Sequence, residues 1–441
     1  MKKLYVKTYG CQMNAYDSAR MADLLAPLGY AGSDTAEDAD MVILNTCHIR
    51  EKATEKVYSD LGRIRALKQE KETKGGRMLV AVAGCTAQAE GREIIARAPV
   101  VDMVVGPQSY HRLPEMIARI ARGAGEPVEA DFPALEKFDV LPEAALATGV
   151  SAFLTVQEGC DKFCTFCVVP YTRGPEHSRS PEQILKEARA LCARGAREVV
   201  LLGQNVNAYR GVDAEMRTWS LARLIAALAE IGDVLRIRYT TSHPRDMSED
   251  LIEAHARVDK LMPFLHLPAQ SGSDRVLGAM NRQHRVQDYL RLIGRIRDRR
   301  PDMAFSSDFI VGFPGESDED FEATLQLVRE VGYAQCFSFK YSARPGTPAA
   351  AGKQIPESVK TSRLGILQAL LAAQQDGAND ALVGRRLDVL FEKPGRSPGQ
   401  IVGRAPTMQP VHLAGPTSLI GRLCAVEIEA RTANSLKGRL V

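Results

Sequence analysis

Cys160, Cys164 and Cys167 follow one another with the spacing C-x-x-x-C-x-x-C. Thiolates this close together can bind one metal centre, but they supply no fourth ligand. A structural zinc site uses four protein ligands, and a bacterial ferredoxin motif has a fourth cysteine. The spacing therefore predicts an iron–sulfur cluster with one iron left open for chemistry.

Three other cysteines each follow a short strand-like run. The runs at 4–9, 41–44 and 78–83 end just before Cys11, Cys47 and Cys85. Such runs are typical of parallel strands, and the helical patterns between them predict an open parallel α/β sheet, to which 102–105 adds a strand. The carboxyl ends of parallel strands share one edge, where ligands bind. These cysteines are therefore predicted to meet there and to hold a second open iron–sulfur cluster.

The composition is that of an ordinary globular protein. The chain has 441 residues, 45% hydrophobic and 25% charged, with a net charge of +3 and nine cysteines. No apolar run reaches the roughly 18 residues that span a bilayer, and no export signal precedes the first cysteine. We therefore expect a cytoplasmic protein without a membrane partner. Its thiols are expected to be metal ligands or buried, not disulfides; Cys192, Cys336 and Cys424 are expected to be structural.

From residue 151 onward, strand and helix patterns alternate six times. Strands are expected at 153–156, 198–202, 235–241, 264–267, 304–311 and 335–339, and helices start near Pro181, Ser220, Ser248, Val286, Asp318 and Pro356. This alternation requires parallel strands with crossover helices. Six units are too few for the closed eight-unit barrel, so the pattern predicts an incomplete, laterally open barrel. The loop with Cys160 follows its first strand.

The last segment has a different character. Short strand patterns broken by glycine and proline predict a small β-barrel of roughly 60 residues. Residues 379–441 carry nine Lys or Arg against five Asp or Glu. This surplus favours contact with phosphates of a nucleic acid, although a merely solvated surface is an equal alternative from composition alone.

The fold class is therefore α/β, in three parts. We place an open parallel α/β domain at 1–120, a linker at 121–145, an incomplete (β/α)6 barrel at 146–376 and the small β-barrel at 378–441.

With both cysteine triads located, the chain resembles the radical S-adenosylmethionine superfamily and, within it, the MiaB-type tRNA methylthiotransferases. The most specific stretches are Asn45-Thr46-Cys47 with 49–53, then 157–174, 202–209 and Thr241-Ser242-His243-Pro244. The continuation Tyr171-Thr172-Arg173-Gly174 favours the tRNA enzymes over their ribosomal-protein relatives. The last segment resembles the TRAM domain of RNA-modifying enzymes.

The resemblance implies two [4Fe–4S] clusters and S-adenosylmethionine as cofactors. Cys160, Cys164 and Cys167 are expected to hold the catalytic cluster, which generates the 5′-deoxyadenosyl radical. Cys11, Cys47 and Cys85 are expected to hold the cluster that carries the sulfur. The contacts implied for S-adenosylmethionine are Phe166, packed on its adenine, and the strand-end residues Gly203, Gln204, Asn205, Ser242 and Gln270.

The implied reaction places a methylthio group at the 2-position of an N6-isopentenylated adenine next to the anticodon. Its aromatic C–H bond is too strong for acid–base chemistry, which explains the need for a radical cofactor. The expected partners are the anticodon stem-loop of tRNA and an electron donor such as flavodoxin or ferredoxin, and we expect a monomer.

Three other functions stay open. A ribosomal-protein aspartate methylthiotransferase shares both clusters and the terminal barrel. A threonylcarbamoyladenosine tRNA methylthiotransferase differs in its substrate pocket. An RNA-binding protein stabilised by metal, without catalysis, would hold zinc in place of iron.

Overall fold

The computed structural model describes residues 1–48, 51–123, 126–132, 137–142 and 149–441. The chain divides into two compact units. Unit 1 comprises Met1–Leu146, Glu158–Asp161 and Val168–His177, and unit 2 comprises Ala147–Gln157, Lys162–Cys167 and Ser178–Val441. The short strands β8 (Gln157–Glu158) and β9 (His177–Ser178) lie at two of the points where the chain passes from one unit to the other.

Unit 1 is built on a six-stranded parallel sheet with the strand order β2-β1-β3-β4-β5-β6. The strands are β1 (Lys2–Thr8), β2 (Tyr30–Gly32), β3 (Met41–Thr46), β4 (Leu79–Gly84), β5 (Met103–Val105) and β6 (Val128–Glu129). The helices are α1 (Gln12–Leu25), α2 (Glu51–Thr73), α3 (Cys85–Glu90), α4 (Arg92–Arg97), α5 (Leu113–Ala121), α6 (Lys137–Val140) and α7 (Val169–Thr172).

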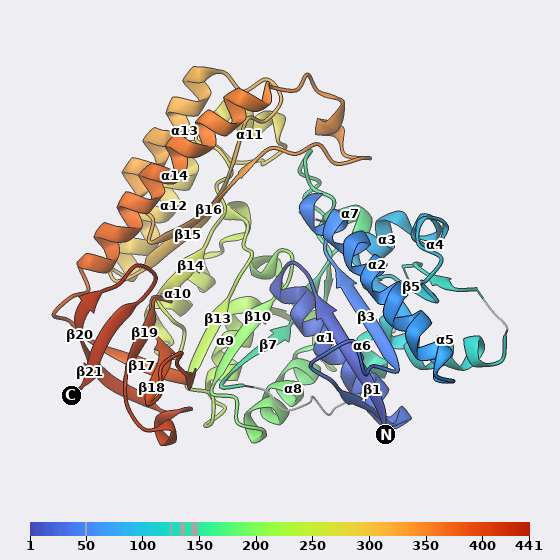
Figure 1. The fold of residues 1–441 in the computed structure, drawn as a ribbon. Helices are drawn as coiled ribbons and strands as arrows, with labels where there is room; N and C mark the ends of the chain where they lie inside the picture. Colours follow the sequence, from blue (N-terminus) through green and yellow to red (C-terminus); the bar gives the residue numbers. More distant parts are fainter. Residues whose placement is uncertain (49–50, 124–125, 133–136, 143–148) are drawn as a thin grey trace. The chain divides into compact units, whose positions relative to one another are not determined.

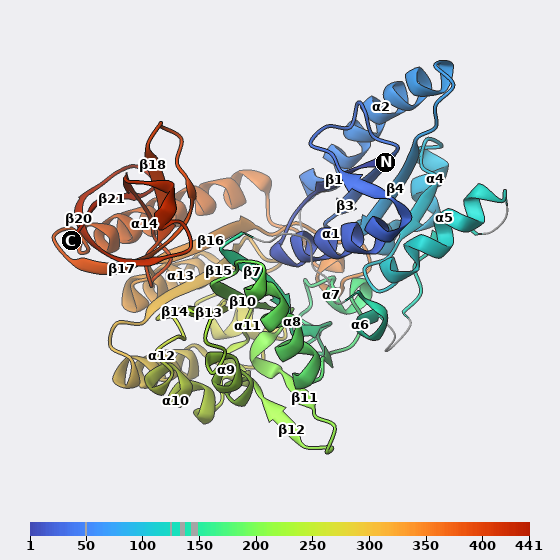
Figure 2. The same ribbon diagram turned by 90° about the horizontal axis from the view of Figure 1, so that it is seen from below.

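Both faces of this sheet are covered by helices, as Figure 2 shows from below. On one face, Val42 and Leu44 of β3 pack with Leu61 of α2; on the other, Met41 and Ile43 pack with α1 and α5. All six residues of β3 are buried, as are those of β4. A strand covered on both sides reads as a continuous apolar run, and this is why the sequence located β3 and β4.

The segment with little periodicity after residue 123 is not all irregular. It contains β6, which pairs with β5 and extends the sheet, and α6. These elements have two and four residues, too short to give a periodic signal. Other residues of the predicted linker, 124–125, 133–136 and part of 143–148, lie outside the described residues, as do 49–50 of the 49–53 motif.

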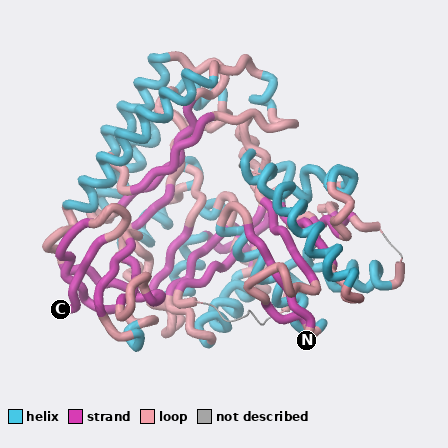
Figure 3. Tube along the Cα trace, viewed as in Figure 1, coloured by secondary structure: helices cyan, strands magenta, loops and turns pink. Residues whose placement is uncertain are grey.

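Unit 2 contains the predicted six-unit partial barrel, so this part of the fold prediction is confirmed. Its parallel strands are β7 (Ser151–Thr155), β10 (Glu198–Leu202), β13 (Arg236–Tyr239), β14 (Phe264–His266), β15 (Ala304–Val311) and β16 (Gln335–Lys340). They form the sheets β13-β10-β7 and β14-β15-β16, joined by a parallel bridge between Ile237 and Leu261. Figure 3 shows these strands with helices packed outside them.

The crossover helices begin at or next to the residues expected from the sequence. They are α8 (Pro181–Ala193), α9 (Leu221–Ala229), α10 (Glu249–Arg257), α12 (Val286–Arg299), α13 (Asp318–Val331) and α14 (Glu357–Asp380). Ser180, Ser220 and Ser317 each accept a hydrogen bond from a backbone N–H of the first turn, as good N-caps do. Not predicted were α11 (Asp274–Ala279) and the hairpin of β11 (Arg210–Val212) and β12 (Thr218–Ser220).

The C-terminal segment of unit 2 is the predicted small barrel. It is closed, with the strand order β17-β18-β19-β21-β20. The strands are β17 (Arg386–Pro394), β18 (Gln400–Arg404), β19 (Pro410–Ala414), β20 (Leu423–Arg431) and β21 (Leu436–Leu440). The short strand patterns of the sequence, at 387–392, 399–404 and 423–428, located β17, β18 and β20, but β19 and β21 were missed. In Figure 1 the barrel is the red part of unit 2.

Two buried arginines of β13 attach this barrel to the rest of unit 2. Arg236 donates to the carbonyl oxygens of Asp388 and, at 2.7 Å, Arg404. Arg238 donates to the carbonyls of Pro406 at 2.7 Å and Ala405 at 3.1 Å. Burial lowers the pKa of Arg236 to about 10. The two buried guanidinium groups thus hold the barrel by its backbone carbonyl groups, and these hydrogen bonds offset the cost of burying the two charges.

Candidate metal and cofactor centres

Cys11, Cys47 and Cys85 lie at one edge of the unit 1 sheet. They follow β1, β3 and β4, which are adjacent in the strand order. Thr8 is paired with Asn45, and Thr46 with Gly84, so the three strands end at the same level. Cys47 and Cys85 are buried, whereas Cys11 is exposed. The strand order therefore brings together three thiols that are far apart in sequence.

The thiols act on one another electrostatically. A hydrogen bond with Cys47 and the charge of Arg173 lower the pKa of Cys11 to about 6. Burial raises the pKa of Cys85, and the charge of Arg173 opposes the rise. Metal binding requires deprotonated thiols, so the lowered pKa of Cys11 favours the form that a metal ion needs, whereas burial opposes that form at Cys85.

Two glycines make room for this site. Gly10 precedes Cys11 with φ of 96°, and a Cβ at Gly10 would lie 2.2 Å from the Cβ of Cys47 and 2.6 Å from its sulfur. Gly84 precedes Cys85 with φ of 90°, and its Cβ would lie 2.4 Å from the carbonyl oxygen of Thr46. Because only glycine adopts such a φ without strain and leaves this space open, both positions shape the cradle of the thiols.

Asn14, fully buried on α1, connects the strand ends. Its side-chain NH2 donates to the carbonyls of Tyr9 and Thr46, both at 2.8 Å. Its side-chain oxygen faces Cys11 at 3.7 Å and accepts from Arg173 at 3.2 Å. Asn14 was not among the predicted site residues, because a polar residue at the start of a helix has no distinctive spacing.

The C-x-x-x-C-x-x-C loop is divided between the two units. Cys160 belongs to unit 1, where its N–H donates to the carbonyl of Gly174 at 3.2 Å. Cys164 and Cys167 belong to unit 2, where the N–H of Cys167 donates to the carbonyl of Cys164 at 2.9 Å. Each part of the loop is thus fixed by backbone hydrogen bonds of its own unit.

Residues after α11 hold the unit 2 part of the loop. The Thr165 N–H donates to the carbonyl of Met280 at 3.0 Å, and the Asn281 side chain donates to the carbonyl of Phe163 at 3.0 Å. Arg282, also buried, donates to the sulfur of Cys164 at 3.6 Å. Arg282 was not predicted, because it is more than a hundred residues from the cysteine that it contacts.

The residues expected to contact S-adenosylmethionine lie at the strand ends of unit 2. Phe166 packs beside an apolar cluster that contains Phe313 and Tyr341. Gln157 accepts from the N–H groups of Gln204 at 2.9 Å and Asn205 at 3.0 Å. A Cβ at Gly203 would lie 2.5 Å from the same Gln157 oxygen and 2.9 Å from the Gln157 carbonyl oxygen, so a side chain at residue 203 would force Gln157 to move.

Three buried polar atoms at these strand ends lack a partner within the described residues: Ser242 Oγ, His243 Nε2 and Gln270 Oε1. Burial lowers the pKa of His243 to about 2, and its Nδ1 accepts from the N–H of Arg245 at 3.2 Å. The neutral ring therefore carries its proton on Nε2. Unsatisfied buried groups are costly, and a polar ligand such as S-adenosylmethionine would satisfy both the donor and the acceptors.

The inner face of β14, β15 and β16 carries groups that the sequence did not reveal. The strand register puts Phe337 beside Asp308 and His266 beside Ser306. Phe305 and Phe309, which alternate along β15 with Ser306 and Asp308, are buried on the helix side. Because successive side chains of a strand point to opposite faces, Ser306 and Asp308 and the residues paired with them face the barrel interior. His266 contacts Ser306 at 3.0 Å and Asp308 at 3.5 Å, and its ring lies 6.3 Å from that of Phe337, which is 45% exposed.

No helix among the described residues is long and apolar enough to cross a membrane.

Comparison with known families gives three consecutive matches. Residues 3–106 match a family described as Uncharacterized protein family UPF0004, residues 154–328 match the Radical SAM superfamily, and residues 380–441 match the TRAM domain. A protein of Maricaulis maris (strain MCS10) named tRNA-2-methylthio-N(6)-dimethylallyladenosine synthase is 60% identical over 444 residues, which cover 100% of this chain and 97% of that protein.

Solved structures share the fold at low sequence identity. The radical S-adenosylmethionine methyltransferase TsrM from Kitasatospora setae, with cobalamin and a [4Fe-4S] cluster bound, superposes with a TM-score of 0.58 at 14% identity, over 79% of this chain and 77% of that one. The cobalamin-dependent radical enzyme OxsB gives a TM-score of 0.56 at 10% identity, over 84% of this chain and 56% of that one. At these identities the likeness establishes the fold alone.

Proposed function

This chain belongs to the tRNA-2-methylthio-N(6)-dimethylallyladenosine synthase family of radical S-adenosylmethionine enzymes, and from that premise we propose what its own residues do. The family resemblance predicted from the cysteine motifs is thereby confirmed. The reaction converts N6-isopentenyladenosine next to the anticodon of tRNA to its 2-methylthio derivative. The observation that carries this function is the 60% identity over the whole chain.

We assign Cys11, Cys47 and Cys85 as ligands of one [4Fe–4S] cluster and Cys160, Cys164 and Cys167 as ligands of the other. When bound, each cluster supplies an open iron, one for the reductive cleavage of S-adenosylmethionine and one for delivery of sulfur. The first assignment is supported by the shared sheet edge, by the space that Gly10 and Gly84 leave open, and by the lowered pKa of Cys11. Three thiols and no fourth suit a cluster that must keep one iron open.

Ser242, His243 and Gln270 are assigned to S-adenosylmethionine, with Phe166, Gly203, Gln204 and Asn205. The unsatisfied buried atoms of the first three support this. The Nε2–H of neutral His243 donates, whereas Gln270 Oε1 accepts. Gly203 keeps the strand end bare, so that backbone approaches the ligand closely.

The inner face with His266, Asp308 and Phe337 is assigned to the adenine of the substrate. Bases taken out of a stack pack on aromatic rings and pair with polar groups at their edges. An exposed phenylalanine beside an imidazole and a carboxylate offers both kinds of contact. The prenyl group is apolar, and the Phe337 ring suits it as well.

The terminal barrel is assigned to the phosphates of the tRNA. Its side chains Arg385, Arg386, Lys393, Arg396 and Arg422 are exposed, and such contacts position a nucleic acid without reading its sequence. An electron donor such as flavodoxin or ferredoxin, a monomeric state and a cytoplasmic location complete the proposal.

Mass spectrometry of tRNA nucleosides tests this function. Cells lacking the gene should accumulate N6-isopentenyladenosine and lose its 2-methylthio derivative, and the wild-type gene should restore it. In vitro, hypomodified tRNA and ribosomal protein are offered separately to the purified chain. Methylthiolation of the protein alone, or of threonylcarbamoyladenosine alone, would contradict the proposed substrate.

A further inference from the structure

Arg173 is a buried cation beside the thiols of unit 1. It follows α7 directly and is 3% exposed. Helix α7 packs on α3, whose first residue is Cys85. The sequence gives Arg173 only as part of a motif, and the cluster assignments above use it only through its charge, which helps to lower the pKa of Cys11.

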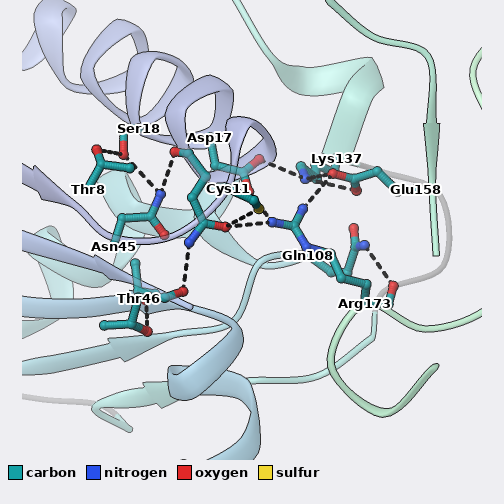
Figure 4. Close-up of polar contacts among 12 residues, drawn as sticks. Thr8, Cys11, Asp17, Ser18, Asn45, Thr46, Gln108, Lys137, Glu158 and Arg173 are labelled. Carbon is teal, nitrogen blue, oxygen red and sulfur yellow. Dashed lines mark hydrogen bonds and ion pairs between the residues drawn. The ribbon is translucent and has the colours of Figure 1, made fainter. Parts of the chain in front are cut away.

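Two carboxylates and an amide hold its guanidinium in place. One nitrogen donates to Glu158 at 3.0 Å, and the other donates to Asp17 at 2.7 Å and Asn14 at 3.2 Å. Lys137 contacts the same carboxylates, Glu158 at 2.8 Å and Asp17 at 3.6 Å (Figure 4). The four charged side chains are each at least 97% buried, and their charges sum to zero.

Stability gives little reason for such a network. Removing charges from water costs about as much as their attraction returns, so well-packed apolar residues often stabilise equally. The planar fork of arginine, however, fixes the direction of its remaining N–H groups. With Asp17 and Glu158 on two sides, the guanidinium is oriented. It lies next to the thiols, because the Asn14 oxygen that accepts from it at 3.2 Å is 3.7 Å from the Cys11 sulfur.

A cation and a hydrogen bond at a cluster ligand have a defined electronic effect. Net charge and hydrogen bonds to the sulfurs set the reduction potential of iron–sulfur clusters. Both stabilise the reduced form, which carries one more negative charge. Unit 2 has a counterpart, since Arg282 donates to Cys164.

We propose that Arg173 is a positioning residue of the site of Cys11, Cys47 and Cys85: its oriented guanidinium directs a positive charge and an N–H group toward these thiols and raises the reduction potential of the cluster bound there. This inference rests on the proposed function, because it presupposes that these cysteines hold a cluster. The same guanidinium holds Glu158, two residues before Cys160, so the loop of the other triad is attached to this site through one side chain.

The test isolates the cluster of unit 1 in the full-length chain. A parent with Cys160→Ala, Cys164→Ala and Cys167→Ala is reconstituted without oxygen and should hold roughly four irons. Into it are introduced Asp17→Asn with Arg173→Gln, which removes one charge of each sign and keeps the network neutral, and separately Arg173→Lys. Redox titration followed by electron paramagnetic resonance gives the potential.

The double substitution should lower the ratio of reduced to oxidised cluster at least tenfold at a fixed ambient potential, about 59 mV for a one-electron couple. Arg173→Lys keeps the charge but not the fork, so it should give a smaller shift. Arg20→Gln is the matched control: Arg20 is a buried arginine of the same unit that pairs with Asp23, and its loss should leave the potential unchanged.

An unchanged potential with iron retained in the double variant overturns the inference and leaves the proposed function intact. A parent without iron at Cys11, Cys47 and Cys85 contradicts the proposed function first. If the double variant does not fold, the Arg173→Lys variant provides the test. A reduction potential and a spectrum identical to those of the parent would then also overturn the role of Arg173.

Discussion

Gly10→Ala should disrupt the site of Cys11, Cys47 and Cys85 while leaving the sheet formed. At φ of 96° an added side chain costs about 1–2 kcal/mol. The new Cβ would also lie 2.2 Å from the Cβ of Cys47 and 2.6 Å from its sulfur, so Cys47 must move. Overpacking of this kind costs about 1–3 kcal/mol, which brings the expected loss of unfolding free energy to about 2–5 kcal/mol.

Gly29→Ala is the matched control. Gly29 lies beyond the other end of α1 with φ of 81°, but nothing stands within 4 Å of its Cβ position. Only the backbone strain of about 1–2 kcal/mol should remain. Urea unfolding of the apoproteins measures both losses. Iron analysis after anaerobic reconstitution should give roughly eight irons per chain for Gly29→Ala and about four for Gly10→Ala.

The reasoning is refuted if Gly10→Ala matches Gly29→Ala in both stability and iron content. That result would mean that the Cys47 side chain can move without lowering the free energy of unfolding and that the space beside Gly10 does not shape the site.

Three other predictions concern unit 2. Burial lowers the pKa of His255 to about 3, so below about pH 6.5 the unfolded chain binds a proton that the folded chain does not. The free energy of unfolding should therefore fall from pH 6.5 toward pH 3 by about 1.4 kcal/mol per pH unit from this group. The unfolding free energy of His255→Asn should lack that slope. Arg236→Gln removes donors to Asp388 and Arg404; hydrogen exchange in residues 386–404 should quicken, whereas exposed Arg223→Gln should change nothing there. Phe337→Ala should raise the KM for tRNA several-fold without loss of iron, and Phe337→Tyr should restore it; an unchanged KM would remove the inner face from the substrate site.

The sequence predicted most of what depends on long, strongly patterned elements. Four long strands were located with ends within two residues of those observed, namely β3, β4, β10 and β15. Their residues are buried on both faces or alternate closely between buried and partly buried. The short elements β2, β6 and α11 were missed because two to six residues give no periodicity. β19 and β21 have five residues each and lie among glycine, proline and polar residues, so they give no clear alternating pattern.

In the candidate site, too, some residues could be predicted from the sequence and others could not. Cysteines at strand ends could be found because a parallel sheet brings such ends together. Asn14, Asp17, Lys137 and Arg282 could not, since their partners are set by tertiary packing between residues far apart in sequence. Arg173 stood inside a quoted motif, but nothing in the motif reveals that its guanidinium lies beside the thiols of another segment.

The separation of two three-cysteine sites is tested most directly by one variant, Cys11→Ala with Cys47→Ala and Cys85→Ala. Purified without oxygen and supplied with S-adenosylmethionine, a reductant and hypomodified tRNA, it should retain roughly four irons and still form 5′-deoxyadenosine, yet yield no 2-methylthio product. Sulfur insertion at the wild-type rate, or zinc in place of iron in the wild-type chain, would contradict the account.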